Sequence, residues 1–291
     1  RGTPKFSQGT YVSPDGRTLY VSRGYMGDVA ACDIASGRQL WRRSLDTPRA
    51  DHMTITPDGR WLFASALAHN RVDRIDANTG EVTGSFISGI YPHDNQITED
   101  GRHVINSSLG DMSLPVARRD NVSKPGDKSG YAYQLTVVEV KSLAVANRIR
   151  MPAGVRPWHM KPGGGVLYAQ TSNSHSVIAF SYPEGKEIGR IDLPVAKGVT
   201  EADYDFDAPH HGLAMSHDGA TLCLAGGASD YAALVRAPDL ELIATVPVGD
   251  APGWSAMADK DRLCILANTR DDTVSLVSIA DTKEIARLSV G

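Results

Sequence analysis

Four histidine motifs recur along this 291-residue chain, each near the start of a short run that leads into a tight turn. They are Asp51-His52, Pro92-His93-Asp94, Pro157-Trp158-His159 and Pro209-His210-His211-Gly212. Imidazole nitrogens and carboxylate oxygens are ligands that Zn²⁺, Fe²⁺, Mn²⁺ and Cu²⁺ accept from proteins. A neighbouring carboxylate can also orient an imidazole ring that binds a metal. The residue types therefore indicate a divalent transition metal or acid–base chemistry by a His-Asp pair.

A repeated turn sequence follows these motifs and defines the elements that must position them. Its copies are Ser13-Pro14-Asp15-Gly16, Thr56-Pro57-Asp58-Gly59, Thr98-Glu99-Asp100-Gly101, Lys161-Pro162-Gly163-Gly164, Ser216-His217-Asp218-Gly219 and, more weakly, Asp259-Lys260-Asp261. Asp-Gly between two apolar runs is a strong hairpin signal because glycine accepts the positive φ of such turns. In five of the six copies, a second turn follows after 20 or 21 residues. Each repeat therefore predicts four strands joined by hairpins.

A repeat of about 42 residues with four strands is typical of a propeller blade. We therefore predict an all-β fold in which residues 1–291 form a single β-propeller domain of four-stranded antiparallel blades. Six repeats predict six blades, with seven as the alternative. Two longer spacings predict insertions at about 110–130 and 195–208, near the mouth of the central channel. Because the first strand of each blade lines that channel, the histidine motifs are expected to converge on its axis.

Register is the open point of this prediction. Counting back from each turn aligns Asp51, His93, Arg156 and His211. Aligning on the prolines instead puts together Asp94, His159, His211 and Trp254. A one-residue slip turns a side chain to the other face of a strand. A bulge in some blades would reconcile the two alignments.

These motifs give a specific set of candidate site residues. The predicted metal ligands are His52, His93, His159 and His211. In a metal-free alternative, His93 acts as the general base with Asp94 or Asp51. Substrate contacts are predicted for Arg156, Trp158, His210 and Trp254, with the acidic segment around Asp203, Asp205 and Asp207 as a lid. For any single histidine, the competing interpretation is a hydrogen bond to the backbone of a neighbouring blade.

Composition limits the classes of partner that we expect and the roles of the cysteines. The net charge is 30 − 34 = −4 with no basic face, so no nucleic acid is expected as a partner. No apolar run approaches the roughly 20 residues of a membrane span. Cys223 and Cys264 occupy equivalent positions in neighbouring repeats, and we interpret them as separate buried thiols. His69 and His175 are expected to be exposed turn residues.

The repeat resembles the YVTN-type β-propeller family. Leu19-Tyr20-Val21-Ser22, Leu62-Phe63-Ala64-Ser65 and Leu167-Tyr168-Ala169-Gln170 stand at the family's eponymous position, and the resemblance covers all six repeats. It implies similarity to lactonase-like and cytochrome d1-like propellers. Relatives of this type are often exported, so the resemblance also implies an extracytoplasmic location.

Together these observations predict an enzyme that acts on a small-molecule substrate at a His-rich, metal-binding site. The expected chemistry is that of a metal-dependent or His/Asp-based hydrolase or lyase, most plausibly lactonase-like. A serine hydrolase mechanism is not favoured because the chain has no Gly-x-Ser-x-Gly elbow. The alternative is a non-catalytic module that binds a protein, a glycan or another ligand.

Overall fold

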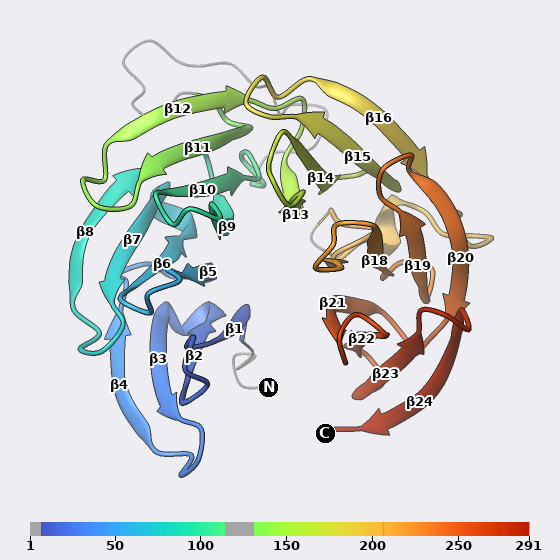
Figure 1. The fold of residues 1–291 in the computed structure, drawn as a ribbon, viewed down its shortest axis with the longest axis horizontal. Helices are drawn as coiled ribbons and strands as arrows, with labels where there is room; N and C mark the ends of the chain where they lie inside the picture. Colours follow the sequence, from blue (N-terminus) through green and yellow to red (C-terminus); the bar gives the residue numbers. More distant parts are fainter. Residues whose placement is uncertain (1–6, 114–130, 206, 291) are drawn as a thin grey trace. The chain divides into compact units, whose positions relative to one another are not determined.

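Six four-stranded antiparallel sheets make up the fold of this computed structural model, which describes residues 7–113, 131–205 and 207–290 (Figure 1). Each sheet consists of four consecutive strands, the arrangement of a propeller blade. The predictions of an all-β fold and of six four-stranded propeller blades are therefore confirmed. Two compact units divide the chain, Arg1–Val155 (unit 1) and Arg156–Gly291 (unit 2). That residues 1–291 act as one domain stays a prediction.

Unit 1 contains the first three blades. Blade 1 comprises β1 (Gly9–Val12), β2 (Thr18–Arg23), β3 (Asp28–Asp33) and β4 (Gln39–Ser44). Blade 2 comprises β5 (Ala50–Ile55), β6 (Trp61–Ala66), β7 (Arg71–Asp76) and β8 (Val82–Ile87). Blade 3 comprises β9 (Pro92–Ile97), β10 (His103–Ser108), β11 (Gln134–Glu139) and β12 (Val145–Arg150). Most of the predicted insertion at 110–130 lies outside the described residues.

Unit 2 contains the other three blades. Blade 4 comprises β13 (Val155–Met160), β14 (Val166–Thr171), β15 (Ser176–Ser181) and β16 (Glu187–Asp192). Blade 5 comprises β17 (Leu213–Met215), β18 (Thr221–Gly226), β19 (Tyr231–Arg236) and β20 (Glu241–Pro247). Blade 6 comprises β21 (Pro252–Ala258), β22 (Leu263–Asn268), β23 (Thr273–Ser278) and β24 (Lys283–Ser289). The insertion at 195–208 lies between β16 and β17 and contains a short 3₁₀ turn, η4 (Glu201–Asp203).

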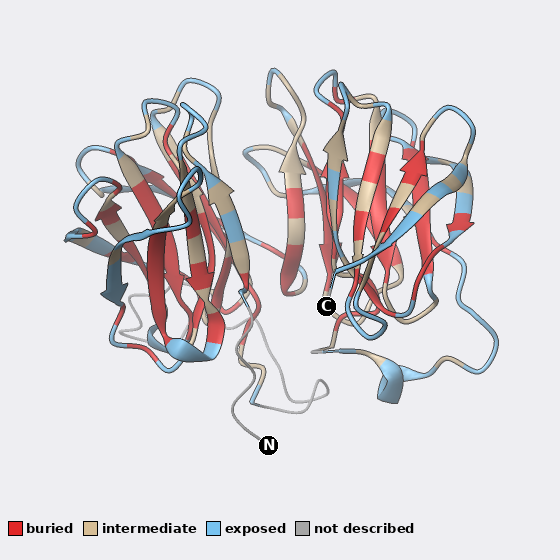
Figure 2. Ribbon diagram, turned by 90° about the horizontal axis from the view of Figure 1, so that it is seen from below, coloured by how far each residue is buried: buried red, intermediate tan, exposed pale blue. Residues whose placement is uncertain are grey.

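Burial is concentrated in the inner strands of each blade. Figure 2 shows the inner strands of the blades largely buried and the outermost strands largely exposed. In unit 1, Phe63 and Val72 of blade 2 pack against Val104 and Val138 of blade 3. Burying such side chains contributes about 1.5–3 kcal/mol each.

The repeated Asp-Gly turns are stabilised by the aspartate itself. In four of them, one carboxylate oxygen accepts hydrogen bonds from the hydroxyl two residues earlier and from the backbone N–H two residues later. The residues are Asp15, Asp58, Asp100 and Asp218. At Asp58, the hydroxyl of Thr56 and the N–H of Arg60 hold the pKa of the carboxyl below its usual value. This network explains why the turn sequence recurs.

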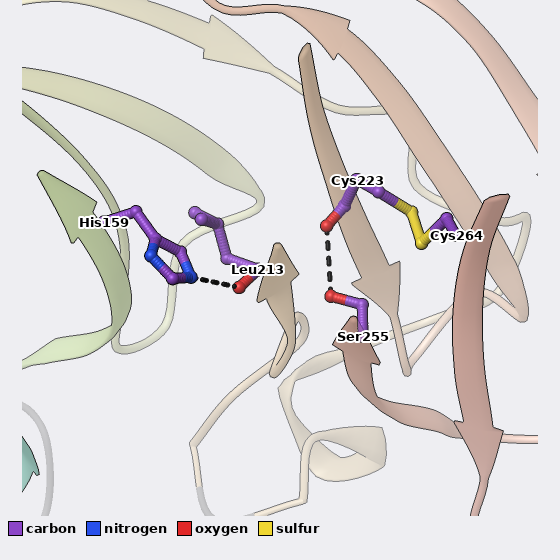
Figure 3. Close-up of a disulfide and its surroundings, with 5 residues drawn as sticks. All are labelled: His159, Leu213, Cys223, Ser255 and Cys264. Carbon is purple, nitrogen blue, oxygen red and sulfur yellow. Dashed lines mark hydrogen bonds between the residues drawn. A yellow bond between two sulfur atoms is a disulfide. The ribbon is translucent and has the colours of Figure 1, made fainter. Parts of the chain in front are cut away.

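A disulfide joins blades 5 and 6 within unit 2. Cys223 of β18 and Cys264 of β22 are both fully buried, and their sulfur atoms are 2.09 Å apart (Figure 3). The interpretation of these residues as separate thiols is therefore wrong. Their equivalent positions in adjacent blades bring their Cα atoms to 6.4 Å, within the range that a disulfide spans.

The Asp58→Ala variant tests the turn network. We expect a loss of about 1 kcal/mol of unfolding free energy at pH 7, because two hydrogen bonds are removed. Because folding lowers the pKa of Asp58, the ionised carboxylate stabilises the fold at pH values above the unfolded-state pKa of about 3.9. This stabilisation is lost as the pH falls through the pKa of the folded state. The difference from wild type should therefore shrink in urea titrations below pH 4. Glu81→Ala, at an exposed turn position, is the control. If Asp58→Ala and wild type gave the same urea unfolding curve at every pH, the aspartate would not stabilise the turn.

The Cys223→Ala/Cys264→Ala variant tests the disulfide. The bond closes a sequence separation of 41 residues. The chain-entropy treatment assigns about 4 kcal/mol of stability to a loop of that length. We expect urea unfolding of the variant at a lower midpoint, and alkylation of denatured, unreduced wild type at Cys32 alone. Alkylation of three cysteines in that sample would contradict the assignment, and Cys32→Ala serves as the stability control.

Candidate metal centre

A one-residue bulge interrupts the first strand of blades 2 and 3. In β5, Ala50 pairs with Ala66 and Met53 with Ala64, so Asp51 and His52 together lie opposite a single residue of β6. In β9, the register shifts in the same way across His93 and Asp94. Blade 6 shows a shift at Gly253. The bulge that would reconcile the two sequence alignments is therefore present.

The order of the two residues is reversed between the two bulges. Blade 2 reads Asp51-His52, and blade 3, 42 positions later, reads His93-Asp94. The rings of His52 and His93 stack with their centroids 4.5 Å apart and their planes at 11°. Both histidines are buried. Two of the predicted metal ligands thus lie together in unit 1.

A buried polar hub fixes the backbone of this histidine pair. The Ser65 hydroxyl of β6 donates to the carbonyl of His93 at 2.9 Å. The Asn95 amide donates to the carbonyl of His52 at 3.0 Å and to the Ser65 oxygen at 2.8 Å. The Asn106 amide of β10 donates in turn to the Asn95 side-chain oxygen. Because these residues are fully or almost fully buried, each bond lies in a medium of low dielectric and is strengthened there.

Carboxylates flank the histidine pair. Asp51 is 1% exposed, and its Oδ1 atom is 3.7 Å from Nε2 of His52. Its other oxygen is 3.9 Å from Nε of Arg49. Burial raises the pKa of the Tyr11 hydroxyl of β1, and the carboxylates of Asp94 and Asp51 raise it further. Tyr11 therefore stays protonated beside two acidic groups.

Sequence reasoning missed Tyr11. It lies in the first strand of blade 1, as His52 does in blade 2. Counted back from the Asp-Gly turn of its own blade, however, Tyr11 occupies the position that Thr54 has in blade 2, and not the position of a histidine motif. Its place in a first strand could have identified it, because the first strand of every blade was predicted to supply the site residues.

Unit 2 carries the other predicted ligands. His211 places Nδ1 3.3 Å from the carbonyl of Gly253, and its ring meets Trp254 edge-on at 5.2 Å. His159 places Nε2 3.1 Å from the carbonyl of Leu213 (Figure 3). Burial lowers the pKa of His159, so its ring is neutral at pH 7 and donates this bond. His159 thus forms a hydrogen bond to the backbone of a neighbouring blade, which was the alternative to metal binding for any single histidine.

The predicted substrate-binding residues differ in exposure. Arg156, Trp158 and His210 are buried, and the Arg156 guanidinium donates to Ser172 at 3.0 Å. Trp254 is 36% exposed. The substrate role of these four residues stays a prediction.

The acidic insertion between β16 and β17 lies against the blade ends of unit 2. Tyr204 contacts His175 at 2.7 Å, the Ala196 N–H donates to the Ser229 hydroxyl, and Asp205 is 3.3 Å from Arg270. These three partners occupy the turns before β15, β19 and β23. In antiparallel blades those turns are at the end where the first strands begin. The segment therefore contacts this end of unit 2, and its role as a lid stays a prediction.

Three of the predicted ligands, His52, His93 and His211, each offer a ring nitrogen that could bind a metal ion. No protein-family model matches the chain, and no curated protein matches it. The similarity to YVTN-type repeats therefore stays a prediction. None of the helices in the described ranges is long and apolar enough to cross a bilayer.

The Ser65→Ala variant tests the polar hub. We expect a loss of about 1–3 kcal/mol of unfolding free energy, because the carbonyl of His93 and the Asn95 amide lose a buried partner. Urea unfolding measures the loss, and the matched control is Ser85→Ala on the exposed strand β8. If the two variants unfold at the same urea concentration, the hub does not hold the histidine backbone.

Proposed function

We propose that the protein is a metal-dependent hydrolase or lyase for small-molecule esters or lactones, with His52 and His93 as ligands of one divalent transition metal ion. The observation that carries this proposal is the stacked, buried histidine pair flanked by Asp51. The candidate ligand atoms of the two rings lie within 4.8 Å of each other. Because an ion binds an imidazole nitrogen in the plane of the ring, the stacked rings must turn about their side-chain torsions for both to reach one ion.

Each neighbouring residue has a role in this proposal. A bound ion supplies hydroxide near neutral pH by lowering the pKa of a coordinated water. Asp51 or Asp94 would accept the one proton released from that water, and the other carboxylate would keep the imidazoles oriented. The Tyr11 hydroxyl, held protonated by its surroundings, donates a hydrogen bond to the oxygen that becomes negative as the ester carbonyl is attacked.

The choice of substrate and compartment rests on two further arguments. The resemblance to lactonase-like propellers favours a cyclic or linear ester over a peptide. The Cys223–Cys264 disulfide favours an oxidising, extracytoplasmic compartment, because such bonds rarely persist in a reducing cytosol.

Elemental analysis of untagged protein, combined with hydrolysis assays on a panel of lactones, tests the proposal. We expect at least one transition metal ion per chain and hydrolysis that stops on chelation and returns with metal. His52→Ala and His93→Ala should each lose the ion and lower kcat/KM by at least about 100-fold, since the ion supplies the nucleophile. His211→Ala and His159→Ala, measured in the same way, test the ligands predicted in unit 2.

His69→Ala is the matched control, because His69 is an exposed histidine of the same unit. Its metal content and activity should equal those of wild type. Folded His52→Ala and His93→Ala variants that keep the full metal content of wild type would refute the ligand assignment. Metal-free wild-type protein that ignores chelators would favour the non-catalytic binding module.

A further inference from the structure

A second pair of imidazoles lies within unit 2. His175 precedes β15 and His210 precedes β17. Their rings meet edge to face, with centroids 5.1 Å apart and planes at 90°. His210 is 1% exposed and His175 is half-buried, which contradicts the prediction of an exposed turn histidine at 175.

The hydrogen bonds of this pair fix which nitrogen of His210 carries the proton. The Tyr231 hydroxyl donates to the carbonyl of Pro194 at 2.7 Å. It therefore accepts from Nε2–H of His210, which lies 3.0 Å away. Nδ1 of the neutral ring then carries a lone pair. At His175, Nε2 is likewise engaged, by the Tyr204 hydroxyl at 2.7 Å.

The Nδ1 atoms of both rings are buried and have no hydrogen-bond partner among the described residues. Leaving one such atom unsatisfied costs about 1–3 kcal/mol, so two in contacting rings call for a ligand. An imidazole nitrogen that carries a lone pair and has no protein partner is a ligand that Zn²⁺ and Cu²⁺ accept.

The ring separation fits one shared ion. Two imidazoles bound to one tetrahedral ion at about 109° have centroids about 5 Å apart, given metal–nitrogen bonds of about 2.0–2.1 Å. The observed value is 5.1 Å. We propose that His175 and His210 bind a second transition metal ion of the zinc or copper class through their Nδ1 atoms, with Tyr204 and Tyr231 orienting the rings.

Zinc binding by the His52→Ala/His93→Ala variant tests this site apart from the first one. After loading with Zn²⁺ and gel filtration, we expect this variant to retain one ion per chain. Adding His175→Ala should remove it, whereas adding His69→Ala, the exposed histidine before β7, should not. Because the first site is already removed, failure of the proposed function does not affect this result.

Two further measurements keep the proposal falsifiable if the combined variants do not fold. Wild type should hold one more zinc ion than His175→Ala. Tyr231→Phe, which removes the acceptor of the His210 Nε2–H, should weaken zinc binding at this site about 10–100-fold. Zinc stoichiometry unchanged by His175→Ala would overturn the proposal and indicate a buried water at the two Nδ1 atoms.

Discussion

The extra residue in the first strand of blades 2 and 3 is the constraint on which the candidate centre depends. In a regular strand, adjacent side chains point to opposite faces, so a histidine and its neighbouring aspartate would separate. The bulge places two adjacent residues opposite a single partner residue, and bulges commonly re-aim side chains beside functional sites. The reversed order, Asp51-His52 and then His93-Asp94, brings an imidazole from each blade to the same place.

Burial of the blades makes that placement rigid. Because the inner strands are packed on both faces, the polar groups beside the bulges are largely buried. The hub of Ser65, Asn95 and Asn106 satisfies the backbone around the bulges, which would otherwise leave buried polar atoms without partners. The same residues that allow the irregular backbone therefore also hold the histidine pair.

The strands and turns could be predicted because local chemistry determines them: Asp58 and Gly59 specify a turn wherever alternating apolar runs flank them. The meeting of His52 and His93 was only half predictable, since one unpaired residue in a strand leaves no mark in the alternation. The disulfide was missed because Cys223 and Cys264 are joined by register across two blades and not by a short motif. His175 was missed because its contacts come from Tyr204 and His210, both distant in sequence.

Anomalous X-ray diffraction at the absorption edge of the metal found in the purified protein tests the central claim most directly. The account predicts a peak about 2 Å from a ring nitrogen of both His52 and His93. A peak that lies away from both rings would contradict it. So would metal-loaded crystals in which the two rings form only hydrogen bonds to the protein.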